Sequence, residues 1–221
     1  MPYPDRFYPV VDSVAWVKRL AALGVGTIQL RVKDAPETQA VALVREALAA
    51  AAGAKLVVND YWRAAIDAGA AHVHLGQEDL AEADVSAIRR AGLTLGLSTH
   101  DDAELENALR HDPDYVALGP IYPTTLKAMR FAPQGLERIT EWKKRVGDIP
   151  LVAIGGITLE LAAPIYAAGA DSIAVVSDIS RNENPDARVR AWLGQTRIDT
   201  LGPEPTLAAF RGVPGGLRKT L

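Results

Sequence analysis

Two basic side chains alternate with apolar ones in the segment Gln29–Lys33. If this segment is a β-strand, Gln29, Arg31 and Lys33 project from one face. Leu30 and Val32 then project from the other face. Two cations and an amide on an inward-facing surface are costly without an anionic partner. The pattern therefore indicates binding of an anionic ligand, and ion pairing with acidic residues of the same interior is the alternative.

Carboxylates follow the next two apolar stretches. Asn59 and Asp60 come directly after Leu56–Val58, and Asp79 comes shortly after Leu75. Such carboxylates suit Mg²⁺, which usually takes one or two of them together with water and substrate phosphate oxygens. We therefore expect Asp60 and Asp79 to bind magnesium, and the alternative for each is an N-cap of the following helix.

Hydroxyl side chains follow the apolar stretches in the middle of the chain. Ser98 stands near His100, but no strained nucleophile-elbow sequence surrounds the pair, so we expect Ser98 to hydrogen-bond a ligand. A longer connection then carries Thr124, Thr125 and Lys127. Long loops in compact barrels usually close over ligands, and these side chains suit a phosphate.

Glycine and serine follow the last two apolar stretches. Gly155-Gly156 would let the backbone approach a phosphate, and Ser177 comes directly after Val176. Backbone N–H groups from two such loops often bind phosphate in α/β barrels. The chain therefore has a charged anion site and a neutral one, which suits a reaction that joins or splits two phosphorylated molecules.

His72 and His74 lie two residues apart and would point the same way from a strand. Such a pair can indicate zinc, but no third ligand is evident. We interpret His74 as a polar residue of the barrel interior or of the site wall.

The elements that must position these residues alternate regularly. Short apolar runs with little internal alternation predict strands buried on both faces. The predicted strands are Phe7–Val11, Thr27–Leu30, Lys55–Val58, Ala71–Leu75, Leu93–Leu97, Tyr115–Leu118, Leu151–Ile154 and Ser172–Val176. The predicted helices are Val14–Leu23, Glu37–Ala51, Tyr61–Ala68, Ala83–Ala91, Asp102–Arg110, Gln134–Arg145, Leu159–Ala168 and Pro185–Leu193. This order predicts an α/β protein with a (β/α)₈ TIM barrel, and an open doubly wound sheet is the main rival.

Length and composition agree with a single barrel. The chain has 221 residues, and we expect one catalytic domain over residues 1–193 and a turn-rich C-terminal extension of unknown role over 194–221. A net charge of −3 argues against nucleic-acid binding. The absence of cysteine excludes disulfides and fits a reducing compartment, and no signal sequence or membrane span is evident. We therefore expect a cytoplasmic protein with small-molecule partners, and a homo-oligomer remains open.

Seven of these segments, taken in order, resemble the thiamin phosphate synthase family. The resemblance runs from about Phe7 to Ser180. The segments are Gln29-Leu30-Arg31-Val32-Lys33, Val58-Asn59-Asp60, His74-Leu75-Gly76-Gln77-Glu78-Asp79, Gly96-Leu97-Ser98-Thr99-His100, Gly119-Pro120-Ile121-Tyr122-Pro123-Thr124, Ala153-Ile154-Gly155-Gly156-Ile157 and Val175-Val176-Ser177.

The resemblance implies a transferase of thiamine biosynthesis. Such an enzyme joins 4-amino-2-methyl-5-hydroxymethylpyrimidine diphosphate to 4-methyl-5-(2-phosphoethyl)thiazole and releases pyrophosphate. It implies that Asp60 and Asp79 carry Mg²⁺ and that Arg31, Lys33, Ser98 and Lys127 are catalytic. The implied substrate-binding residues are Gln29, Leu30, Arg31, Val32, Lys33, Asn59, Ser98 and Lys127 on the pyrimidine side, and Thr124, Thr125, Leu126, Gly156, Val176 and Ser177 on the thiazole side.

One residue departs from the family pattern. Family members commonly read Pro-Thr-x-Thr-Lys where this chain has Leu126 before Lys127, which puts affinity for the thiazole phosphate in question. The related thiazole tautomerase is an alternative, but its resemblance places a histidine where this chain has Pro120. A non-catalytic barrel that binds thiamin precursors is the second alternative.

Overall fold

The computed structural model describes residues 3–33, 35–124 and 131–201, with the backbone alone for 197–201. Its eight parallel strands close into one barrel in chain order, which confirms the predicted fold and excludes the open sheet. The strands are β1 (Phe7–Val11), β2 (Thr27–Leu30), β3 (Lys55–Asn59), β4 (His72–Leu75), β5 (Thr94–Thr99), β6 (Tyr115–Leu118), β7 (Leu151–Ile154) and β8 (Ser172–Val175).

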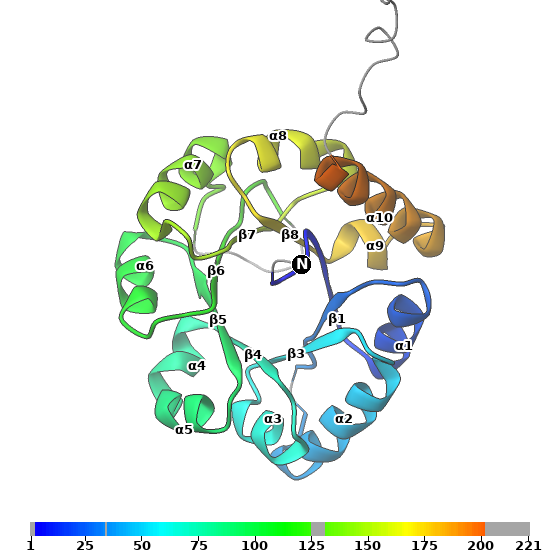
Figure 1. Cartoon of the computed structure of the whole chain (residues 1–221), viewed down its shortest axis with the longest axis vertical. Coiled ribbons are helices and arrows are strands. Elements are labelled where there is room, and N and C mark those ends of the chain that lie inside the picture. The colour runs from blue at the N-terminus through cyan, green and yellow to red at the C-terminus, as the bar shows by residue number, and fades with distance from the viewer. Residues whose placement is uncertain (1–2, 34, 125–130, 202–221) are drawn as a thin grey trace, which may run out of the picture.

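Helices form a ring around this barrel (Figure 1). They are α1 (Val14–Ala22), α2 (Glu37–Ala50), α3 (Trp62–Ala68), α4 (Gln77–Glu82), α5 (Val85–Arg90), α6 (Asp102–Leu109), α7 (Gly135–Val146), α8 (Ala162–Ala167), α9 (Ser177–Ser180) and α10 (Pro185–Leu201), with a 3₁₀ turn η1 (Leu159–Leu161). Where the structure describes the chain, no helix has both the length and the apolar character that a bilayer crossing requires.

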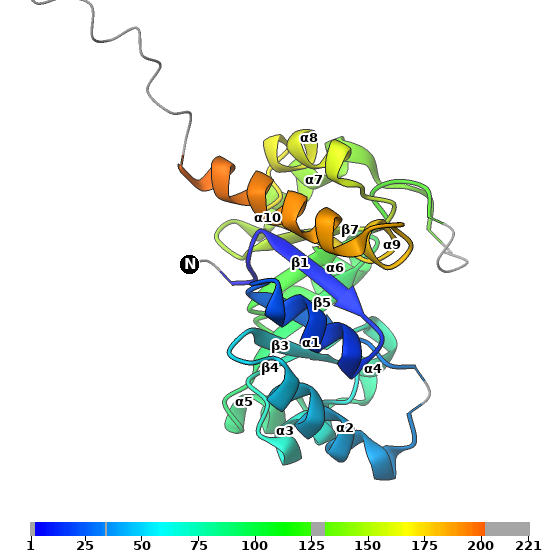
Figure 2. The same ribbon diagram turned by 90° about the vertical axis from the view of Figure 1, so that its right-hand side faces the viewer.

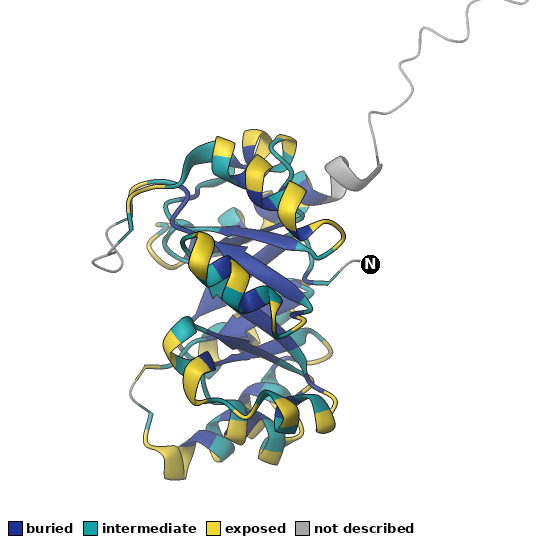
Figure 3. Cartoon of the chain, turned by 90° about the vertical axis from the view of Figure 1, so that its left-hand side faces the viewer, coloured by how far each residue is buried: buried dark blue, intermediate teal, exposed yellow. Residues whose placement is uncertain are grey.

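The strands are buried on both faces, as their unbroken apolar runs predict. Their outer faces and the inner faces of the helices form the main hydrophobic core, and the ribbon shows buried strands under helices that are exposed outside (Figure 3). A second, smaller cluster fills part of the barrel interior: Tyr8, Val10, Val57, Tyr115, Ala117, Val152 and Ala174. Buried polar residues occupy the rest of that interior on β2, β3 and β4, namely Gln29, Asn59 and His74.

The N-terminal end of the barrel is closed by residues 3–6. The Tyr3 ring stacks on His72 at 4.6 Å between centroids, and the Asp5 carboxylate accepts a hydrogen bond from Lys55 at 3.1 Å. In side view the start of β1 and the described part of the connection between β6 and α7 lie toward opposite ends of the barrel (Figure 2). Among the described residues, 3–6 therefore cover the N-terminal end of the barrel interior.

Two short helices were not predicted. α4 contributes a single buried residue, Leu80, and α9 contributes only Ile179, so neither carries the apolar repeat that identifies a helix in a sequence. Both follow strands directly, and they bring Asp79 and Ser177 into helical first turns. In the predicted helix 159–168, the first residues form the 3₁₀ turn η1.

The last helix is longer than predicted. α10 continues through Gly194 to Leu201, so the predicted boundary at residue 194 lies inside a helix. Glycine costs only about 1 kcal/mol in a helix interior. Packing outweighs that cost here, because Trp192 is fully buried and its ring stacks on Phe7 at 5.3 Å. Residues 202–221 of the predicted extension lie outside the described residues.

Candidate active site

A cavity of about 860 Å³ opens at the C-terminal ends of the strands. Eleven of the predicted site residues line it, although they come from seven different strands or the segments that follow them. They are Gln29, Arg31, Lys33, Asn59, Asp60, Asp79, Ser98, Thr124, Gly156, Val176 and Ser177. The fold therefore brings together residues that are far apart in sequence.

Five other predicted residues are not seen in the cavity wall. Leu30 is buried in the outer core and Val32 packs against it, so the strand alternation turns these two side chains away from the cavity. The prediction that they bind substrate is not supported for their side chains. Thr125, Leu126 and Lys127 lie outside the described residues.

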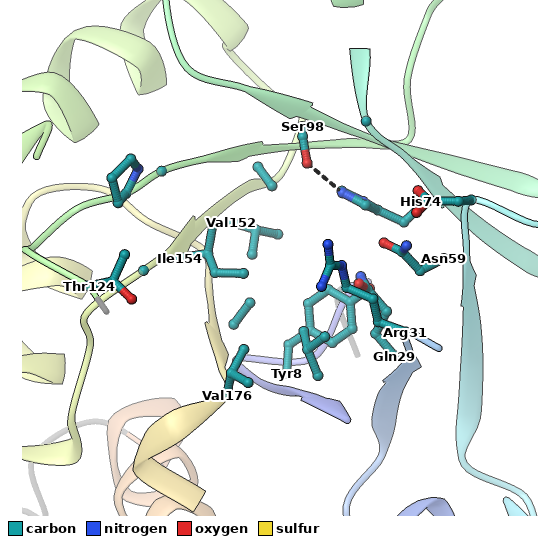
Figure 4. A pocket seen from close by; sticks show the side chains of 18 of the residues that line it. Tyr8, Gln29, Arg31, Asn59, His74, Ser98, Thr124, Val152, Ile154 and Val176 are labelled. Atoms are coloured by element: carbon teal, nitrogen blue, oxygen red, sulfur yellow. Dashed lines mark hydrogen bonds between the residues drawn. The ribbon is translucent and has the colours of Figure 1, made fainter. Parts of the chain in front are cut away.

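One wall of the cavity is polar and the opposite wall is neutral. Figure 4 shows Gln29, Arg31 and Asn59 across the opening from Val152, Ile154 and Val176. Neither Arg31 nor Lys33 forms a salt bridge within residues 3–33, 35–124 and 131–196. The alternative of internal ion pairing therefore finds no support in this part of the chain. Both cations line the cavity, where an anionic ligand could reach them.

Asp60 and Asp79 lie close enough to repel each other. Burial, and then the charge of Asp79, raises the pKa of Asp60 to about 6, and the Arg31 charge offsets this in part. The N-cap of α3 is Tyr61 and that of α4 is Gly76, and neither helix has a side-chain cap. The alternative that these carboxylates act as helix caps is therefore wrong.

The backbone at Asp60 is held in an unusual conformation. Its φ is 66°, in the left-handed region, and its N–H donates to the carbonyl oxygen of His74 at 2.9 Å. This conformation ends β3 and turns the chain into α3. The amide nitrogen of the neighbouring Asn59 is buried and makes no hydrogen bond of ordinary geometry, although the Asn59 side chain lies close enough to Asp60 to lower its pKa.

His74 is a wall residue, as interpreted from the sequence. It is 6% exposed, and both ring nitrogens lie within hydrogen-bond distance of hydroxyls, Tyr115 OH at 2.9 Å and Ser98 Oγ at 2.8 Å. Burial, with a smaller effect from Arg31, lowers the pKa of His74 to about 4, so its ring is neutral near pH 7. Within the described residues, no three histidine, aspartate or glutamate side chains are grouped to hold a metal.

The loops after β6 and β7 pack tightly on each other. A Cβ on Gly156 would lie 2.5 Å from the carbonyl oxygen of Pro123, so only glycine fits there at its φ of 69°. Ile121 N–H donates to the Ile154 carbonyl at 2.9 Å, which joins the two loops. The predicted role of Gly156 was approach to phosphate, and the structure adds a packing role.

A buried carboxylate anchors α9, which starts at Ser177. Asp178 accepts hydrogen bonds from the Arg188 guanidinium, at 2.8 Å, and from Trp192 Nε1, at 2.8 Å. It also accepts from the backbone N–H of Leu159 at 3.3 Å. Asp178 therefore ties the loops after β7 and β8 to α10.

Several residues that line the cavity were not predicted as site residues. Tyr8 and Gln77 come from β1 and α4, and His100 and Glu104 follow β5. Glu104 accepts from both the backbone N–H and Nδ1 of His100, at 2.8 and 2.7 Å. His100 was part of a recognised segment, but Tyr8 sits in an apolar run where no sequence signal distinguishes it from a core residue.

Comparison with known proteins agrees with this geometry. Residues 7–179 match the family model described as thiamine monophosphate synthase. A thiamine-phosphate synthase from Rhizobium etli is 60% identical over 194 residues, which cover 87% of this chain and 95% of that protein. One from Citrobacter koseri is 51% identical over 186 residues, covering 83% and 88%.

A solved structure is similar as well. Thiamine phosphate pyrophosphorylase from Pyrococcus furiosus superposes with a TM-score of 0.77 at 26% identity, covering 89% of this chain and 97% of that one. The family model spans most of the barrel and includes both walls of the cavity. The chain belongs to the thiamine monophosphate synthase family.

Proposed function

We propose that this chain joins 4-amino-2-methyl-5-hydroxymethylpyrimidine diphosphate to 4-methyl-5-(2-phosphoethyl)thiazole, giving thiamin phosphate and pyrophosphate. Membership of the family supports this reaction. The observation that carries it is the division of one cavity into a polar wall, whose Arg31 and Lys33 form no salt bridge within the described residues, and a neutral wall. The more highly charged diphosphate substrate can then face the cationic wall, and the monophosphate substrate can face the neutral wall of the same cavity.

The polar wall binds the pyrimidine diphosphate in this proposal. Arg31 and Lys33 meet the diphosphate oxygens, and the buried amide nitrogen of Asn59 donates to the same substrate. Gln29 and Ser98 lie deeper in the barrel and hydrogen-bond the aminopyrimidine end. Lys127, which lies outside the described residues, would add a third cation.

Asp60 and Asp79 fit a magnesium ion. Their mutual repulsion, together with the partial burial of Asp60, is the situation that a divalent cation relieves. Two carboxylates are also the number that Mg²⁺ commonly takes from a protein when a substrate phosphate supplies further oxygens. Magnesium, when bound there, supplies positive charge to the diphosphate and to the departing pyrophosphate.

The chain's own residues act mainly by electrostatics and positioning. Arg31 and Lys33 stabilise the negative charge that collects on the leaving oxygen as the carbon–oxygen bond to the pyrimidine methylene breaks. The bonding electrons leave with pyrophosphate, and the aminopyrimidine ring delocalises the positive charge left on the methylene. The lone pair of the thiazole nitrogen then forms the new carbon–nitrogen bond. The thiazole nitrogen is itself the nucleophile and loses no proton, so the protein needs to supply neither a nucleophile nor a general base.

The neutral wall orients the second substrate. Gly156, Val176 and Ser177, with Thr124 on the loop after β6, would hold the thiazole phosphate so that its nitrogen faces the methylene. Holding two reactants in one cavity supplies the entropic part of the rate enhancement. Thr125 and Leu126, also assigned to this phosphate, lie outside the described residues.

The test is a product assay with the purified chain, both substrates and Mg²⁺. We expect thiamin phosphate and pyrophosphate to form in equal amounts. Conversion of the thiazole phosphate alone, without consumption of the diphosphate, would indicate the tautomerase instead. Tight binding of either substrate with no product would indicate the non-catalytic barrel.

A further inference from the structure

A continuous chain of hydrogen-bonded side chains crosses the barrel interior at the floor of the cavity. Gln29 Nε2 donates to Tyr8 OH at 2.7 Å, and Tyr8 OH lies 2.8 Å from Tyr115 OH. Tyr115 OH lies 2.9 Å from Nδ1 of His74, and Nε2 of His74 lies 2.8 Å from Ser98 Oγ. Figure 4 draws this last link, with His74 pointing toward Ser98. We call these five residues the relay.

The relay requires a residue without a side chain in the middle of the sheet. Gly96 on β5 pairs with His74 on one side and with Tyr115 on the other. A Cβ on Gly96 would lie 2.0 Å from Cζ of Tyr115, so the missing side chain is what admits the Tyr115 ring. The Tyr115 and His74 rings stack at 5.5 Å with 20° between their planes. The close approach of His74 and Tyr115 is therefore built into the fold.

Each member of the relay determines the hydrogen-bonding role of the next. Burial raises the pKa of Tyr8 and of Tyr115, so both hydroxyls keep their single proton. Tyr8 accepts from Gln29, and in the arrangement that uses every hydroxyl proton within the relay Tyr8 donates to Tyr115 and Tyr115 donates to Nδ1 of His74. The proton of His74 is then on Nε2 and is donated to Ser98.

The two ends of the relay lie in the cavity wall, and this arrangement sets which of their groups can meet a ligand. The amide nitrogen of Gln29 donates to Tyr8, so the side-chain carbonyl oxygen of Gln29 can accept a hydrogen bond from a ligand. Ser98 accepts from His74, so its own proton is left as a donor. Both ends are cavity residues, whereas Tyr115 is not.

We propose that Tyr8, Tyr115 and His74 are positioning residues that orient Gln29 and Ser98 toward the first substrate. The aminopyrimidine carries an amino donor and ring-nitrogen acceptors, which are complementary to a carbonyl at Gln29 and a hydroxyl proton at Ser98. This inference rests on the proposed function, because it deepens the assignment of the polar wall. It adds Tyr115, which does not line the cavity, and gives Tyr8 and His74 a role that they exert through Gln29 and Ser98.

The first test reads the proton position without any substrate. Nitrogen-15 NMR of labelled protein at pH 7 distinguishes a protonated from an unprotonated imidazole nitrogen, and His74→Gln identifies the signals. We expect a single tautomer of His74 with the proton on Nε2, and a mixture of tautomers in Tyr115→Phe. A proton on Nδ1 in the unchanged protein would reverse the direction of the relay and overturn the inference.

The second test is kinetic. Tyr8→Phe and Tyr115→Phe each remove one hydroxyl, and we expect each to raise KM for the pyrimidine diphosphate about tenfold, with KM for the thiazole phosphate unchanged. Tyr166→Phe is the matched control, because its hydroxyl donates a bond of 2.7 Å to the Arg6 carbonyl outside the relay. If Tyr8→Phe and Tyr115→Phe had the same KM for the pyrimidine diphosphate as the Tyr166→Phe control, the relay tyrosines would only stabilise the fold.

A double-mutant cycle tests whether Tyr115 acts through Ser98. In the Ser98→Ala background, Tyr115→Phe should lower kcat/KM by less than twofold, although it lowers kcat/KM about tenfold on its own. If Tyr115→Phe lowered kcat/KM by the same factor with and without Ser98→Ala, the two residues would act independently and the inference would be overturned. If the unchanged protein makes no product, the proposed function fails, and the NMR result still decides the direction of the relay.

Discussion

At the scale of single residues, Asp60 carries the largest expected effect on catalysis. Asp60→Asn keeps the size of the side chain and suits a φ of 66°, because asparagine adopts the left-handed region readily. It removes one of the two proposed magnesium ligands. We expect kcat/KM to fall at least about a hundredfold, with the far-UV circular dichroism unchanged.

The matched control for this prediction is on α4. Glu82→Gln removes an exposed carboxylate at the end of the same helix that carries Asp79, and it should leave turnover unchanged. Activity is measured by pyrophosphate release over a range of Mg²⁺ concentrations. Unchanged magnesium dependence in Asp60→Asn would remove the metal assignment.

Leu126 is the second residue with a distinct expectation. It stands where the family commonly has threonine, so it offers no hydroxyl to the thiazole phosphate. Leu126→Thr should lower KM for the thiazole phosphate several-fold, about the value of one added hydrogen bond. KM for the pyrimidine diphosphate serves as the internal control. An unchanged KM for the thiazole phosphate would show that position 126 makes no contact with it.

At the scale of elements, the anchoring of α9 connects stability to substrate binding. Asp178→Ala leaves Arg188 without its buried partner and frees the Trp192 N–H. Loss of such a buried pair costs roughly 3 kcal/mol, which urea unfolding would measure. Because Ser177 begins the same helix, KM for the thiazole phosphate should rise as well. A large loss of stability with no change in KM would separate α9 from phosphate binding.

The exposed half of the same ion-pair network should behave differently. The Arg188 guanidinium lowers the pKa of Glu160 to about 2, so the ionised form is favoured in the folded state. Its stabilising effect is therefore present above the ordinary glutamate pKa and is lost as the pH falls toward 2. Glu160→Gln should melt about 2 °C below the unchanged protein at pH 6, and the difference should vanish near pH 2. A pH-independent difference would mean that the charge of Glu160 is not its source.

At the scale of the whole molecule, ligand binding should be visible as stability. A ligand that binds only the folded barrel at about a hundred times its Kd adds about 2.7 kcal/mol to the free energy of unfolding. For a chain of this size we expect pyrophosphate with Mg²⁺ to raise the melting temperature by about 5–10 °C. Pyrophosphate with a chelator should give a much smaller shift. Equal shifts with and without the metal would argue against Asp60 and Asp79 as its ligands.

Much of this architecture could be predicted from the sequence. Apolar runs located every strand, and the polar residues that follow them located eleven residues of the cavity wall, because the alternation of short apolar runs with helical segments is a local pattern. α4 and α9 were missed, since a helix with one buried residue has no apolar repeat. The relay was also missed. Tyr8 and Tyr115 are 107 residues apart, and nothing local distinguishes them from core tyrosines.

The absence of a side chain at Gly96 has a consequence for how this barrel can change over time. A methyl group at position 96 and an aromatic ring at position 115 cannot occupy the same space, since the Cβ would lie 2.0 Å from Cζ. Substitutions at positions 96 and 115 should therefore be correlated in evolution. A relative with a larger residue at the first should carry a smaller one at the second, and its histidine at position 74 would need another neighbour to hold its proton.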